Sequence, residues 1–149
     1  MRNVESDKDQ IYPEPTVGAL IVRSNGDVLL IRSSKWRGAL TVPGGHIELG
    51  ETIEEALRRE VKEEVGLNVE VVKLLLVQEA IYSLEFWKRR HFIFFDFLCS
   101  PSNGAVRVDG HEAQDYLWAR PEEALRLKLD SFTRNLVEKY LEGERRSIR

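Results

Sequence analysis

A chain of 149 residues, of which 42% are hydrophobic, is long enough for one domain with a sizeable core. Its net charge of −3 argues against a dedicated nucleic-acid binder, and no apolar stretch approaches the ~20 residues that cross a bilayer. The single cysteine, Cys99, excludes an internal disulfide and favours a reducing compartment. We expect one cytoplasmic domain over residues 1–149, with flexible termini over about 1–12 and 143–149.

The first third of the chain is expected to form short strands separated by turns. Three apolar segments have strand-like patterns: residues 16–23, 27–32 and 39–42. The Asn25-Gly26 pair favours a tight turn, so we expect the first two segments to pair as a hairpin. The third follows a loop that carries Trp36 and ends in Pro43-Gly44-Gly45, which forces a backbone turn.

A helix is expected next, between Thr52 and Gly66. Thr52 and Glu55 have the spacing of a capping box, and Gly66 suits the left-handed conformation that ends a helix. Further strands are expected at residues 68–78, 90–99 and 116–119, and further helices at 121–127 and 131–141. Strands with intervening helices predict an α/β (α+β) sandwich.

The first helix places acids where core residues are expected. At about 100° of rotation per residue, Glu60 and Glu64 fall in the same sector as Ala56, Leu57 and Val61. Two carboxylates directed at the protein body repel each other and lose hydration. A divalent cation is the simplest compensation, because hard cations take oxygen ligands from carboxylates and phosphates. The alternative is a chance cluster on an exposed, salt-bridged helix.

The neighbouring charges extend this hypothesis. Glu60 and Glu64 lie one turn apart, so one ion is able to reach both. Glu63 lies on the flank of the same surface, where it could reach a second ion or orient a water. Arg59 is placed to pair with Glu55 or Glu63, each four residues away, or to reach back to Glu51.

These residues resemble a known family. Gly45, Glu51 and the run Arg59-Glu60-Val61-x-Glu63-Glu64-x-Gly66-Leu67 look like the complete Nudix box, with every specified position in agreement. The segment from Trp118 through Arg120-Pro121-Glu122-Glu123 also resembles the family, and the likeness covers roughly residues 16–141. It implies a Nudix-type α/β/α sandwich with a mixed β-sheet. It also implies MutT-like hydrolysis of a nucleoside diphosphate linked to another moiety, using Mg²⁺ or Mn²⁺.

The resemblance also implies roles for single residues. It assigns metal ligation to the carbonyl of Gly44 and to the side chains of Glu60, Glu63 and Glu64. Arg59 and Glu51 would pair to hold the loop against the helix.

The general base stays open among Glu63, Glu64 and Glu112. Glu112 lies six residues before Trp118, where some family members carry a catalytic Glu, and its alternative is an exposed loop acid. His111 beside it is expected to be a surface histidine.

Substrate contacts are less well defined by the sequence. Arg32 matches a position where relatives contact phosphate, with a solvated surface residue as the alternative. Trp36 and Tyr82 are candidates for stacking on a nucleobase, a contact worth ~1–3 kcal/mol, with core or interface packing as the alternative. The segment from Glu112 to Asp130 resembles small nucleoside-triphosphatase members.

A (deoxy)nucleoside triphosphate, cleaved to the monophosphate and pyrophosphate, is therefore preferred over ADP-ribose or another nucleotide derivative. A non-catalytic nucleotide-sensing module is the alternative from another class. The expected partner is a small nucleotide, without a nucleic-acid polymer or a membrane, and a homodimer is a further expectation.

Overall fold

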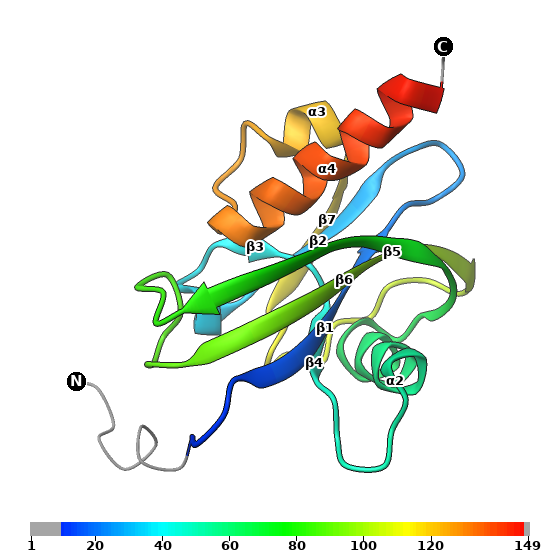
Figure 1. The fold of residues 1–149 in the computed structure, drawn as a ribbon. Coiled ribbons are helices and arrows are strands. Elements are labelled where there is room, and N and C mark those ends of the chain that lie inside the picture. The colour runs from blue at the N-terminus through cyan, green and yellow to red at the C-terminus, as the bar shows by residue number, and fades with distance from the viewer. Residues whose placement is uncertain (1–9, 148–149) are drawn as a thin grey trace.

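The computed structural model describes residues 10–147 (Figure 1). In chain order its elements are β1 (Glu14–Ile21), β2 (Val28–Arg32), the 3₁₀ turn η1 (Ser34–Trp36), β3 (Leu40–Thr41), β4 (Gly44–His46), α2 (Ile53–Val65), β5 (Asn68–Ile81), β6 (His91–Asn103), β7 (Asp115–Ala119), α3 (Pro121–Ala124) and α4 (Ser131–Ser147). Of the expected flexible termini, residues 1–9 and 148–149 lie outside the described residues. Gln10 exchanges two hydrogen bonds with the backbone of His91, and α4 continues past the expected end at Leu141.

The strands form two sheets. The larger has the order β4-β1-β6-β5, with β1 antiparallel to β4 and parallel to β6. The smaller has the order β3-β2-β7 and is antiparallel throughout. The larger sheet therefore combines both strand directions, and the predicted α/β/α sandwich with a mixed sheet is confirmed.

The predicted hairpin between the first two strands is wrong. The turn itself is present, because the Gly26 N–H donates to the Arg23 carbonyl at 2.8 Å. Beyond a single bridge between Val22 and Val28, however, β1 and β2 belong to different sheets. The edge of β1 that faces away from β6 is instead taken by the segment around Pro43 and by β4, since the Ala19 N–H donates to the Pro43 carbonyl at 2.9 Å.

The predicted turn at Pro43-Gly44-Gly45 is only partly correct. The chain bends at Pro43, but Gly44 to His46 form strand β4 along β1. A Cβ on Gly44 would lie 2.1 Å from the Val17 carbonyl oxygen. The glycine is therefore needed for the close approach of two strands rather than for a turn.

The larger sheet is covered on both faces, with α2 on one side and α4 on the other (Figure 1). Successive side chains of β1 alternate between these faces. Ala19 and Ile21 pack in the core with Leu57 of α2, whereas Leu20 packs in the core with Leu136 of α4. Cys99 is fully buried, and none of the described helices is long and apolar enough to span a membrane.

Helix α2 begins and ends as predicted. The Glu55 N–H donates to Thr52 Oγ1 at 3.1 Å, and the Thr52 N–H donates back to the Glu55 side chain. Gly66 ends the helix with a φ of 73°, in the left-handed region. These caps set the helix register and thus fix which acids point inward.

Candidate functional site

The predicted inward orientation of two helix acids is confirmed. Glu60 and Glu64 are only 8% and 4% exposed, although each carries a carboxyl group. Glu63, on the flank, is exposed, as are Glu54 and Lys62 on the outer face. The helix therefore separates buried acids from solvated ones, as its periodicity indicated.

Glu112 completes a cluster with the two buried acids. One carboxylate oxygen from each of Glu60, Glu64 and Glu112 lies within 4.8 Å of the others, and we call these three residues the carboxylate cluster. Glu112 is half-buried, and the Lys35 ammonium donates to its Oε1 at 2.8 Å. His111 beside it is exposed, as expected.

The loop that carries Glu112 is anchored to the end of α2. The Arg107 N–H donates to the Val65 carbonyl at 2.9 Å, and the Asp109 N–H donates to the Glu64 carbonyl at 3.0 Å. Asp109 Oδ1 in turn accepts the N–H of Ala113. These bonds satisfy helix-end carbonyls that would otherwise lack partners, and they fix the loop next to the helix acids.

Burial and proximity set the charge of the cluster. Burial and, after it, the hydrogen bond with Glu112 together raise the pKa of Glu64 to about 10. The same bond lowers the pKa of Glu112, so the proton resides on Glu64 and Glu112 stays ionised. Burial also raises the pKa of Glu60, against the effect of Arg59. Oxygen ligands with this excess of negative charge fit a hard divalent cation, which would take the place of the shared proton.

Arg59 ties the preceding loop to the helix. Its Nε and Nη2 donate to the two carboxylate oxygens of Glu51 at 2.7 and 2.9 Å, so the predicted pair is present. Its Nη1 donates to Glu60 at 2.8 Å and to Glu63 at 3.2 Å. The hydrogen bonds from Arg59 lower the pKa of Glu51 to about 2, so this carboxylate stays charged.

Two glycines bring the backbone of β4 against the helix acids. The Gly44 N–H donates to Glu64 Oε2 at 3.0 Å, and a Cβ on Gly45 would lie 2.5 Å from the Glu60 carboxylate. A side chain at position 45 would therefore displace Glu60. The expected metal contact of the Gly44 carbonyl stays a prediction.

The carboxylate cluster lines a pocket of about 160 Å³. The same pocket is lined by Trp36 and three phenylalanine rings that pack on it, and we call these four residues the aromatic cluster: Trp36, Phe86, Phe94 and Phe132. Trp36 is both packed and pocket-lining, so its two predicted roles are compatible.

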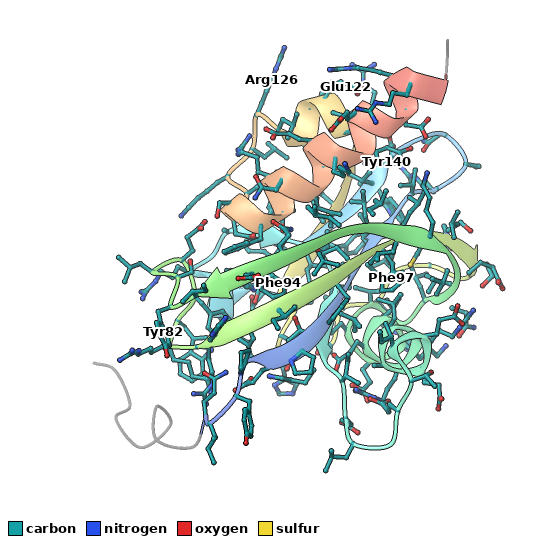
Figure 2. The ribbon with its side chains drawn as sticks, in the orientation of Figure 1. Tyr82, Phe94, Phe97, Glu122, Arg126 and Tyr140 are labelled. Atoms are coloured by element: carbon teal, nitrogen blue, oxygen red, sulfur yellow. The ribbon has the colours of Figure 1, made fainter. Side chains whose placement is uncertain are left out.

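Two predicted substrate residues do not line this pocket. Arg32 donates to the Gly38 carbonyl at 2.9 Å and pairs with Asp115 at 3.5 Å. Tyr82 directly follows β5, distant from helix α2, with the Arg89 guanidinium carbon 3.9 Å from its ring centre (Figure 2). The structure therefore brings Trp36 to the carboxylates but neither Arg32 nor Tyr82.

Asp96 and Lys35 line the pocket and were missed by the sequence analysis. Asp96 is 5% exposed, and burial raises its pKa to about 7. The sequence feature that could have indicated Asp96 is a single acid inside the apolar strand sequence HFIFFDFLC, on the same strand face as Phe94. Lys35 carries no such signal, because its contact with Glu112 joins positions 77 residues apart.

Comparison with known proteins identifies relatives of the whole fold. A family model described as NUDIX domain matches residues 12–140. Nucleoside triphosphatase NudI of Escherichia coli (strain K12) is 30% identical over 132 residues, which covers 82% of this chain and 93% of NudI. The crystal structure of a MutT NUDIX hydrolase from Burkholderia pseudomallei aligns with a TM-score of 0.75 at 29% identity, covering 86% of this chain and 98% of that one. The MutT protein from Methanosarcina mazei Go1 aligns with a TM-score of 0.76 at 24% identity, covering 91% and 99%, a likeness of fold alone.

Proposed function

The chain belongs to the Nudix hydrolase family, and from this premise we propose that it is a divalent-metal-dependent pyrophosphohydrolase that cleaves a nucleoside triphosphate to the monophosphate and pyrophosphate. One observation carries the proposal: three partly or fully buried carboxylates lie together in a pocket that also presents aromatic rings. Buried carboxylates that lie together require a cation to compensate their charge, and aromatic rings are suited to stack on a nucleobase.

The chain supplies the groups that this reaction needs at one end of the pocket. Glu60 and Glu64 would hold the ion, with the Gly44 carbonyl and Glu63 as further ligands. Bound Mg²⁺ or Mn²⁺ would supply charge neutralisation at the diphosphate and a lowered pKa for a water. Arg59 would keep these acids in place through its bonds to Glu51 and Glu60.

Glu112 is our choice for the general base. It is the half-buried member of the carboxylate cluster, and it is not one of the principal ligands that would hold the ion, so its carboxylate would be able to accept a proton from water. Lys35 fixes its orientation, and the half-buried side chain lines the pocket. Glu63, the alternative, is exposed and held by Arg59 outside the pocket lining.

A panel assay with helix variants tests the proposal. The purified protein is incubated with (d)NTPs, ADP-ribose, sugar nucleotides and dinucleoside polyphosphates in Mg²⁺ or Mn²⁺, and the products are separated. We expect pyrophosphate and a nucleoside monophosphate from a triphosphate. Glu60→Gln and Glu64→Gln keep the side-chain shape but remove ligand charge, so each is expected to lower kcat by at least about 10²–10³-fold.

Glu54→Gln is the matched control, because Glu54 lies on the exposed face of the same helix. Its activity should equal that of the unmodified protein. Near-normal turnover in both Glu60→Gln and Glu64→Gln would refute the metal site. Nucleotide binding without hydrolysis across the panel would identify a sensing module instead.

A further inference from the structure

A buried acid lines the pocket without being part of the carboxylate cluster. Asp96 lies on β6 and is more than nine-tenths buried, on the same strand face as Phe94 of the aromatic cluster. Burying a carboxyl group costs free energy unless its oxygens have hydrogen-bond partners. The partners of Asp96 therefore indicate whether the group is structural or directed at a ligand.

Only one oxygen of Asp96 has a partner. The Gln78 Nε2 donates to Oδ2 at 2.9 Å, whereas no donor among residues 10–147 bonds to Oδ1. Oδ1 lies over Gly18, the register partner of Asp96 on β1, where an added Cβ would be 2.3 Å away. The glycine thus leaves room for an acceptor atom that the protein itself does not satisfy. The other buried acid of the pocket outside the carboxylate cluster, Asp130, instead accepts two hydrogen bonds from Thr133.

The orientation of Gln78 is fixed by two further bonds. Its Nε2 also donates to the Phe132 carbonyl at 2.9 Å, and its Oε1 accepts from Asn135 Nδ2 at 3.0 Å. Rotating the amide by half a turn would break both bonds. Gln78 therefore always presents a donor to Asp96.

The sheet register places Asp96 at a useful distance from the carboxylate cluster. Gly44, Gly18 and Asp96 lie in one row across β4, β1 and β6. Strands are about 4.8 Å apart, so the backbones of Asp96 and Gly44 lie roughly 10 Å apart, with Oδ1 over the intervening Gly18. Gly44 contacts Glu64, and Asp96, Gly44 and Glu64 all line the same pocket. A nucleotide with its phosphates at the carboxylate cluster would bring its base to Asp96 and Phe94.

We propose that Asp96 Oδ1 accepts a hydrogen bond from the exocyclic amino group of the nucleobase, so that the pocket selects amino-bearing bases over their keto counterparts. This inference rests on the proposed function, since it concerns the base of the same nucleotide. A keto base would place its carbonyl oxygen against the carboxylate, and two buried acceptors would then lack a donor. Sites built for one hydrogen-bonding pattern reject the opposite pattern strongly for this reason.

Matched substrate pairs and one isosteric variant test the proposal. CTP and UTP differ in an amino against a keto group, as do ATP and ITP. At pH 8.5, above the Asp96 pKa of about 7, we expect the amino member of the better-hydrolysed pair to have a kcat/KM at least about 10-fold higher. In Asp96→Asn, the fixed Gln78 donor attracts the amide oxygen, so the NH₂ group points into the pocket. The preference should then fall by about 10-fold or more, or reverse.

Asp115→Asn is the matched control, because Asp115 is an exposed acid outside the pocket lining. Its ratio of kcat/KM between the amino and keto substrates should be unchanged.

Equal rates within both pairs in the unmodified protein, or an unchanged ratio in folded Asp96→Asn, would overturn the inference while leaving the proposed hydrolysis intact. If no nucleotide is hydrolysed, calorimetric binding of CMP and UMP decides: tighter CMP binding supports the inference and equal affinity overturns it. Should the variant fail to fold, the substrate pairs in the unmodified protein decide alone.

Discussion

The two ends of the pocket are built in different ways. The carboxylate cluster takes Glu60 and Glu64 from consecutive turns of α2, and the loop of Glu112 is bonded to the end of that helix. The aromatic cluster is assembled from η1, β6, α4 and the segment between β5 and β6. One helix thus determines most of the carboxylate cluster, which we call the reacting end. Several elements together form the aromatic cluster, which we call the base end because it would hold the nucleobase. Substitutions at the base end can therefore alter nucleotide preference without moving the carboxylates.

The largest effect should come from the acid that we propose as base. Glu112→Gln is expected to lower kcat by about 10²–10⁴-fold, because proton removal from water is lost. Glu63→Gln would remove a further ligand of the ion but not the proposed base, and Glu63 lies outside the pocket lining, so its effect should be far smaller. Measuring kcat of both variants at saturating substrate from pH 6 to 10 shows which of Glu112 and Glu63 is the base. A full loss in Glu63→Gln with a nearly unaffected Glu112→Gln would transfer the role to Glu63.

A smaller effect at the same end is expected from the residue that positions the acids. Arg59→Lys keeps the charge but cannot make the paired bonds to Glu51 together with that to Glu60. Metal affinity or kcat should fall by about 10–100-fold, as is usual when a partner of a ligand is lost. Titration with Mn²⁺ measures the metal affinity. Arg58→Lys, on the neighbouring position, is the control, and equal losses in both variants would contradict a positioning role.

The base end should respond in KM rather than in kcat. Trp36→Leu removes one stacking face, and a loss of about 1–3 kcal/mol corresponds to a KM increase of roughly 5–150-fold with kcat unchanged. Trp87→Leu is the control, because Trp87 is not among the pocket-lining residues. A lower kcat with unchanged KM would show that the two ends are not separable.

The smallest expected effect concerns stability and pH. Folding raises the pKa of Asp96 to about 7, so the folded state binds more protons than the unfolded state between about pH 4 and pH 7. This group therefore lowers the free energy of unfolding as pH rises through that window, and its effect is constant above it. Urea unfolding with a chelator, from pH 5 to pH 8, should show the unmodified protein losing stability relative to Asp96→Asn. A constant difference would mean that Asp96 titrates normally.

The sequence predicts the reacting end better than the base end for a physical reason. Glu60 and Glu64 are recognisable because helical periodicity is local, and a wheel shows which residues share a face. Glu112 required the family resemblance, since nothing local relates it to the helix. Asp96 lies opposite Gly18, and that pairing depends on a parallel register between strands 78 positions apart. No local pattern encodes such a register.

The same distinction explains the errors in the fold. The caps at Thr52 and Gly66 were predicted because capping depends on neighbours in sequence. The strand partner of β1 was not predicted correctly, because the pair Asn25-Gly26 encodes a turn but not the sheet to which the next strand belongs. Strand β5 also runs to Ile81 rather than ending at Gln78, since it continues wherever β6 offers a partner.

The bonds between the Glu112 loop and the end of α2 have a consequence for local opening. Because the Arg107 and Asp109 amides are held by carbonyls of Val65 and Glu64, the loop can detach only when the last helical turn loses these contacts. Slow hydrogen exchange should therefore be shared between these two amides and those of the helix end. Detachment would carry the third carboxylate away while the sheets stay intact, so transient opening of one short loop would be enough to pause the enzyme.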